Sequence, residues 1–161
     1  MIWMPIYIHI IFSYLAAVGF AVFLNAPKKT LYISGAIGMI SWIIYVLLMR
    51  LGFDMMSSNF FAACVAALLC EILARKMKKP TILFVVPGII TLIPGLGLYN
   101  TMSYVVEGDF QQAFTTGANV LLASGSIALG VIVVSSLFRN YYKKMRLRKY
   151  KEEMEKSEKV I

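Results

Sequence analysis

The stretch that decides the fold is residues 80–100, which read PTILFVVPGIITLIPGLGLYN. It is apolar and long enough to cross a membrane, yet it carries prolines at positions 80, 87 and 94. A proline inside a helix lacks the N–H group and clashes with the carbonyl four residues earlier. Pro87 is therefore expected to free the carbonyl of Leu83, and Pro94 that of Ile90. Interrupted backbone survives in hydrocarbon only where protein buries it or a wet cavity adjoins it.

Such paired interruptions of one apolar segment are typical of the discontinuous helices that form transport sites. The alternative is a helix that is merely kinked and whose freed carbonyls are satisfied by its neighbours. Under the first interpretation, the residues that interrupt the helix are Pro87, Gly88, Pro94 and Gly95. The groups expected to line the pathway are the Ile90 carbonyl and the side chains of Thr91, Tyr99, Asn100 and Asn119.

The composition places the chain in a bilayer. Of its 161 residues, 60% are hydrophobic, and the mean hydropathy is +0.75, whereas a soluble domain contains about 45–50% apolar residues. Five apolar segments approach the roughly 20 residues that a spanning helix needs; they cover residues 5–24, 31–49, 59–74, 81–106 and 113–138. The sequence thus predicts an all-α, multi-pass membrane protein with five transmembrane helices, the fourth broken by proline and glycine.

The distribution of charge indicates the topology. Two basic residues lie between the first and second segments, four between the third and fourth, and nine after the fifth. Five spans put these regions on one side, which then holds 15 of the 16 basic residues and leaves only Arg50 opposite. By the positive-inside rule, the N-terminus faces out and the C-terminus faces the cytoplasm. The net charge of +8 therefore reflects topology in the cell membrane and not nucleic-acid binding.

The expected domain organisation is a five-span membrane domain, residues 1–138, followed by a basic cytoplasmic tail, residues 139–161. The first part of the tail interleaves Lys and Arg with aromatic residues such as Tyr141 and Tyr142. This composition suits contact with anionic lipid headgroups at the membrane surface.

No group of residues points to an enzyme, and no metal or cofactor is expected. His9 is the only histidine, so a histidine-based metal site or catalytic triad would need partners that the sequence does not supply. We interpret it as a packed or interfacial residue. There is also no glycine-rich phosphate loop ending in Lys-Ser or Lys-Thr, which disfavours an ATP-driven role.

Glu71 is the acidic residue placed at membrane depth, where charge is costly and often functional. Arg75 follows four residues later, a favourable spacing for an ion pair on a helix. The favoured interpretation is this local pair, and proton coupling is the alternative.

Other residues are given structural roles. Asn25 and Pro27 are expected to shape the cytoplasmic end of the first segment, and Pro80 stands at the start of the fourth. Small residues let membrane helices approach closely, so we expect packing notches at two pairs of positions, Gly35 with Gly38 and Ser126 with Gly130.

Two motifs resemble the threonine/serine exporter family. The run GFAVFLNAP at residues 19–27, followed by a second span, resembles the opening of that family's small subunits. Residues 80–95, followed by Tyr99 and Met102, resemble the signature of its fourth span. The similarity extends from about residue 15 to residue 137. It departs at Thr91, where many members have a further proline, so the helix is expected to be less rigid after Ile90.

The resemblance implies a subunit of a proton-coupled secondary exporter in the inner membrane. In split members of the family, a larger membrane subunit is the obligatory partner. Family substrates include threonine and serine, and some split pairs are linked to dicarboxylates such as succinate. Free backbone carbonyls would suit the ammonium of an amino acid, and the N-terminus of a half-helix would suit its carboxylate. A non-transporting membrane scaffold or assembly subunit is the alternative function, and self-association into a homo-oligomer is left open.

Overall fold

The computed structural model describes residues 5–158, with side chains through residue 145 and at Arg148. Its elements are α1 (Ile6–Phe23), α2 (Lys28–Arg50), α3 (Met55–Lys76), α4 (Ile82–Ile89), the 3₁₀ turn η1 (Ile90–Leu92), α5 (Gly95–Glu107) and α6 (Phe110–Glu158). Helices α1, α2, α3 and α6 are long and apolar enough to span a membrane. The segment from α4 to α5 makes the fifth candidate span and bends by 58°. The predicted all-α membrane fold with a broken fourth segment is confirmed.

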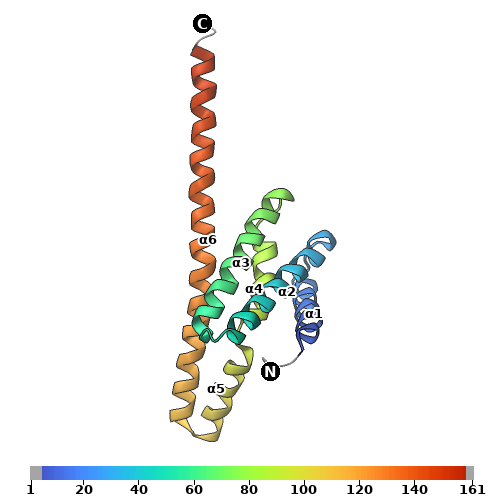
Figure 1. Ribbon diagram of the computed structural model, residues 1–161, viewed down its shortest axis with the longest axis vertical. Coiled ribbons are helices and arrows are strands. Elements are labelled where there is room, and N and C mark those ends of the chain that lie inside the picture. Colours follow the sequence, from blue (N-terminus) through green and yellow to red (C-terminus); the bar gives the residue numbers. More distant parts are fainter. Residues whose placement is uncertain (1–4, 159–161) are drawn as a thin grey trace.

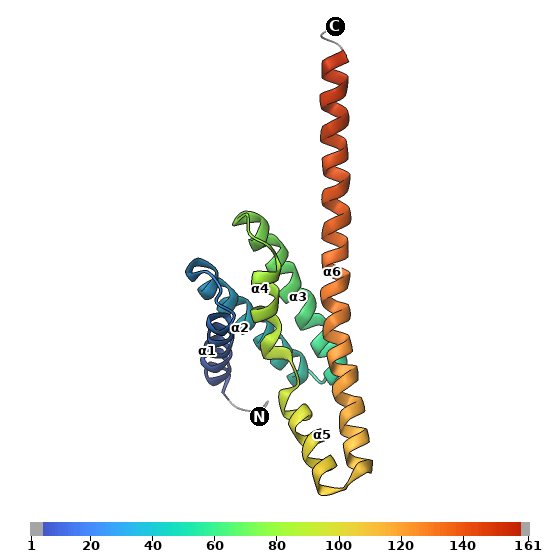
Figure 2. The same ribbon diagram turned by 180° about the vertical axis from the view of Figure 1, so that it is seen from behind.

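The long elements alternate in direction, as Figure 1 and its reverse view in Figure 2 show. The connections at residues 24–27 and 77–81 lie at the same end of the bundle, and α6 rises past that end. The basic residues of the first two basic regions, Lys28, Lys29, Arg75, Lys76, Lys78 and Lys79, therefore cluster there. We call this the basic end.

Backbone geometry ends α1 cleanly at the basic end. Asn25 adopts a positive φ of 53°, a conformation that asparagine tolerates better than most residues. The N–H of Ala26 then reaches back to the carbonyl of Ala21 at 3.0 Å. Pro27 starts α2, and its carbonyl accepts a hydrogen bond from the Thr30 hydroxyl at 2.7 Å. These contacts give Asn25 and Pro27 a local structural function in the turn.

Close packing at small residues holds the bundle together. A Cβ atom added at Gly38 would lie 2.6 Å from the Ala17 side chain and 3.4 Å from the Pro87 carbonyl oxygen. One added at Gly130 would lie 2.7 Å from the carbonyl oxygen of Phe60 on α3. Dispersion contacts of this kind, together with interhelical hydrogen bonds, hold helices together in lipid. The predicted notches at Gly38 and Gly130 are thus confirmed.

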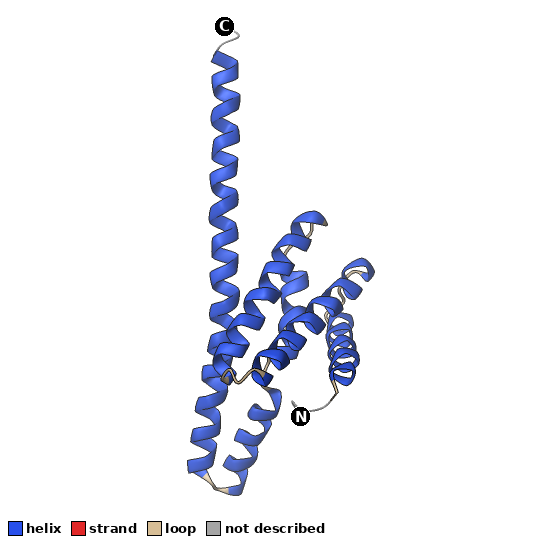
Figure 3. Cartoon of the chain, viewed as in Figure 1, coloured by secondary structure: helices blue, strands red, loops and turns tan. Residues whose placement is uncertain are grey.

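Helices α5 and α6 form a hairpin that projects beyond the other helices, at the end opposite the basic end (Figure 3). Within α5, which is described in full, no residue is buried. Its contact with α6 runs through Gly97, where an added Cβ would lie 2.5 Å from the Val120 side chain. Helix α6 continues for 49 residues without interruption. It therefore crosses residue 138, the expected end of the membrane domain, as one helix.

Candidate functional site at the broken helix

The first interruption, at Pro87, is repaired by a neighbouring helix. Helix α4 passes through Pro87 without ending. The carbonyl of Leu83, four residues earlier, accepts a hydrogen bond from the Ser34 hydroxyl of α2 at 3.3 Å. The expectation that this carbonyl is free is therefore wrong. Pro87 therefore fits the alternative interpretation, in which the helix is merely kinked and a neighbouring helix satisfies the freed carbonyl.

The real break lies between Ile90 and Pro94. The chain tightens into η1, and Ile93 then becomes extended, with φ −62° and ψ 126°, as a residue before proline prefers. The Ile90 carbonyl accepts the N–H of Ile93 at 3.3 Å, and the Ile93 carbonyl accepts that of Gly95 at 2.7 Å. The Ile90 carbonyl is thus also occupied, and α5 restarts at Gly95 at once.

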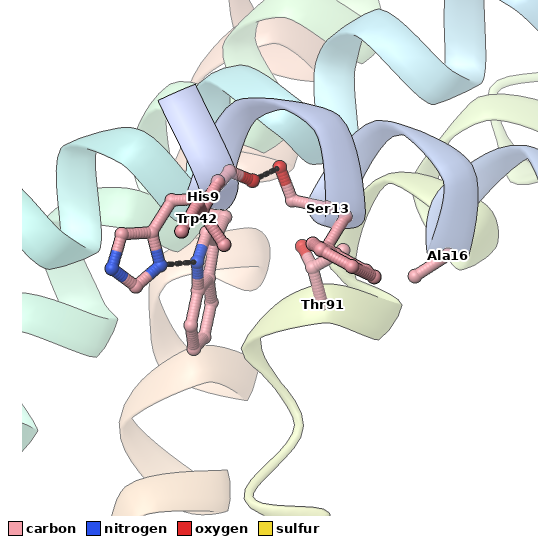
Figure 4. Close-up of a pocket in the computed structure, with 7 residues that line it drawn as sticks. His9, Ser13, Ala16, Trp42 and Thr91 are labelled. Atoms are coloured by element: carbon pink, nitrogen blue, oxygen red, sulfur yellow. Dashed lines mark hydrogen bonds between the residues drawn. The ribbon is translucent and has the colours of Figure 1, made fainter. Parts of the chain in front are cut away.

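Thr91 fixes the break against α2 and borders a cavity. Its hydroxyl donates a hydrogen bond to the Gly38 carbonyl at 3.1 Å. The adjoining space, of about 370 Å³, lies between α1, α2 and η1 and is mostly apolar. We call it the break cavity (Figure 4); the residues that line it are Ile8, His9, Phe12, Ser13, Ala16, Trp42 and Thr91.

A histidine and a tryptophan form the polar wall of the break cavity. The indole Nε1 of Trp42 lies 3.1 Å from Nδ1 of His9. Because an indole N–H can only donate, Nδ1 must accept, and the proton of the neutral imidazole must sit on Nε2. His9 is only 8% exposed, and within the described part of the chain its Nε2 is buried without a hydrogen-bond partner. Leaving such a donor unpaired costs about 1–3 kcal/mol, which an incoming acceptor would recover.

Sequence reasoning interpreted His9 as a packed residue, and its burial agrees with that. The contact with Trp42 was missed, since it joins residues 33 positions apart on two helices. The available signal was a lone imidazole within an apolar segment. Ser13, on the same wall, is satisfied locally because its hydroxyl donates to the His9 carbonyl at 2.6 Å.

Most of the other predicted pathway residues lie away from the break cavity. Gly88 packs on α2 and α3, where an added Cβ would lie 3.0 Å from Ile37 and 3.5 Å from the sulfur of Cys70. Tyr99 is 71% exposed, Asn119 on α6 is exposed and Asn100 is half-buried. Of the predicted polar lining, Thr91 alone borders the break cavity.

Glu71 lies toward the basic end of α3, next to Cys70, which packs near Gly88 of α4. Its Oε2 pairs with the Arg75 guanidinium at 3.1 Å, so the predicted ion pair is confirmed. Pro80 lies just before α4 and is exposed. Glu71 borders a second, separate cavity.

Comparison with known proteins gives the family. Residues 9–137 match the family described as "Threonine/Serine exporter, ThrE". An uncharacterized protein of Haemophilus influenzae is 27% identical over 136 residues, which cover 80% of this chain and 46% of that protein. A protein of Corynebacterium glutamicum named threonine/serine exporter is 26% identical over 136 residues, which cover 84% of this chain and 27% of that protein.

The chain therefore spans about half the length of the first relative and about a quarter of the second. No solved structure matches it significantly. The family match reaches into all the candidate membrane spans and includes both His9 and the break. The chain belongs to the threonine/serine exporter family.

Proposed function

We propose that the chain is a subunit of a secondary active exporter of small amino acids, threonine and serine first, in the cytoplasmic membrane. Family membership supports amino-acid export, and the named relative supports these two substrates. The observation that carries the proposal is the broken fourth span. Its break adjoins a cavity lined by His9, whose Nε2 is buried and has no partner among the described residues.

A larger membrane subunit of the same family is the proposed partner. The relatives are about two and four times as long as the region they share with this chain. In this proposal the partner would supply a counterpart of those additional residues. In this assembly the basic end faces the cytoplasm, because 15 of 16 basic residues belong to the regions that lead to it. The basic part of α6 beyond residue 138 would then contact anionic lipids.

The break cavity offers polar groups to a solute that passes α4. The carboxylate of an amino acid would accept the hydrogen bond of the His9 imidazole, which Trp42 keeps protonated at Nε2, once the cavity wall opens around this buried nitrogen. Thr91 would hold the break open through its bond to α2. The carbonyls of Leu83 and Ile90 have protein partners, so the ammonium group must be recognised elsewhere.

The test is transport by the reconstituted pair. Liposomes containing the chain and the larger subunit are loaded with labelled threonine, serine or succinate, and release is followed with and without a proton gradient. We expect gradient-dependent release of threonine and serine. Release of succinate alone would show that the substrate is a dicarboxylate and not an amino acid. If none of the three compounds is released, the scaffold function is favoured.

A further inference from the structure

A second cavity opens at the basic end, between α3, the start of α4 and α6. It measures about 560 Å³, within the range of roughly 300–1,000 Å³ typical of small-molecule sites. Figures 1 and 2 show α3 and α6 diverging toward this end. We call it the basic-end cavity; its lining residues are Glu71, Arg75, Thr81, Ile132, Ser135, Ser136, Arg139 and Tyr142.

Arg75 forms the fixed part of this cavity. One of its guanidinium nitrogens pairs with Oε2 of Glu71 at 3.1 Å. The guanidinium carbon also lies 3.7 Å from the ring centroid of Tyr142 on α6, a cation–π arrangement. Held by an acid on its own helix and by a ring on the facing helix, Arg75 bridges the two walls and orients Glu71.

Most of the other polar side chains that line the basic-end cavity have no partner among the described residues. In the described part of the chain, Arg139 makes no ion pair or hydrogen bond. The hydroxyls of Thr81, Ser135 and Ser136 likewise form no hydrogen bond there. The second carboxylate oxygen of Glu71 is also left over, since the pair with Arg75 uses Oε2. One cation, one carboxylate oxygen and three hydroxyls therefore face the same space without partners.

We propose that the basic-end cavity binds a zwitterionic hydroxy amino acid, as the site where the exporter loads its substrate from the cytoplasm. The ammonium group would contact the free oxygen of Glu71, the carboxylate would contact Arg139, and the hydroxyl would reach the serine and threonine hydroxyls. This inference rests on the proposed export function, and it supplies the ammonium contact that the break cavity lacks. Glu71 disfavours a dicarboxylate or a phosphate, because either would bring a second negative charge beside it.

The position of the cavity fits a loading step. Thr81 directly precedes α4, and the break begins at the other end of that helix. Helix α4 has eight residues, so it covers only about 12 Å. A solute that leaves the basic-end cavity thus has one short helix to pass before it reaches the break cavity.

The experiment measures protection of a cysteine placed in the cavity wall. Ser136→Cys is introduced into the chain together with Cys64→Ala and Cys70→Ala, which remove the native thiols. The protein and its partner are placed in nanodiscs of neutral phosphatidylcholine. The rate at which a small charged reagent modifies the new thiol is then measured at increasing concentrations of L-serine or L-threonine. We expect saturable, severalfold slowing. Serine methyl ester lacks the carboxylate and 3-hydroxypropionate lacks the ammonium, so neither should protect.

Three further variants test the location of the site. Leu137→Cys places the thiol on the next residue of α6, which is 64% exposed and does not line this cavity, so serine should not protect it. Arg139→Gln should abolish the protection at position 136. Lys143→Gln, which removes a cation one turn further along α6, should leave the protection unchanged.

The possible outcomes distinguish failure of this binding site from failure of the proposed export function. Serine release from liposomes without protection at position 136 overturns the site and leaves the exporter. Protection without release supports the site and contradicts export. Protection that requires phosphatidylglycerol in the nanodiscs, and not serine, overturns the inference in favour of an anionic lipid headgroup.

Discussion

The indole N–H of Trp42 donates to Nδ1 of His9 across 3.1 Å and so joins α2 to α1 at the wall of the break cavity. This single contact decides which imidazole nitrogen carries the proton, because Nδ1 cannot be both an acceptor and a donor. Trp42 also contacts Tyr45 in a tilted arrangement, with ring centroids 5.2 Å apart. The donor to the imidazole thus belongs to an aromatic pair that lies within α2.

Trp42→Phe should release the tautomer of His9, because phenylalanine keeps the aromatic packing and removes the donor. His9 is the chain's single histidine, so nitrogen NMR of histidine-labelled protein without a histidine tag reports this ring alone. We expect the Nε2–H form in the wild type, a mixture of tautomers in the variant, and slower export by the variant. A wild-type ring protonated at Nδ1 would contradict the assignment.

Thr91→Val should weaken the attachment of the break to α2. The change is nearly isosteric but removes the bond to the Gly38 carbonyl, worth about 0.5–1.5 kcal/mol in stability. Thr115→Val is the matched control, since that hydroxyl donates only to carbonyls of its own helix. Unfolding in detergent and amino-acid release are measured for both. Equal effects of the two changes would show that the bond from Thr91 to α2 has no special role at the break.

Pro94→Ala should abolish export, and Pro87→Ala should not. Alanine at position 94 lets η1 extend into α5, which straightens the 58° bend. At position 87 the helix is already continuous, and Ser34 satisfies the affected carbonyl. Spin labels at Val86 and Met102 measure the bend by their separation, while membrane fractionation checks insertion. Full export by the Pro94→Ala protein with a straightened segment would show that the break is dispensable.

Gly130→Ala should destabilise the contact between α3 and α6. The new Cβ would meet the Phe60 carbonyl oxygen at 2.7 Å and the Ala63 side chain at 3.0 Å, and overpacking of this kind costs about 1–3 kcal/mol. Gly125→Ala on the same helix is the control, because apart from the adjacent part of its own helix no described atom lies within 4 Å of its added Cβ. Thermal unfolding in detergent distinguishes the two; similar melting temperatures would disprove the close contact.

The broad architecture could be predicted because the bilayer constrains it strongly. Apolar length located the first four spans and the start of the fifth to within about four residues, and proline spacing located the broken segment; the end of α6, far beyond residue 138, was missed. Small residues marked the close contacts at Gly38 and Gly130 correctly. These features depend on the local sequence and on the thickness of the membrane, so they need no knowledge of which helices are neighbours.

The candidate site was less predictable because it depends on pairs of distant residues. Ser34 and Leu83 are 49 positions apart, and their contact converts the first proline from a break into a kink. Tyr99 and Asn100 lie on α5, which the 58° bend carries away from the bundle. They therefore do not reach the break cavity, although they belong to the same apolar segment as the break. Their roles on the pathway remain predictions.

The uninterrupted length of α6 has a consequence for its place in the membrane. Its 49 residues make a rod of about 74 Å, more than twice the roughly 30 Å of a hydrocarbon layer. No more than about half of this rod fits within the hydrocarbon layer. The basic residues from Arg139 onward therefore lie on the part of the same continuous helix that extends beyond it.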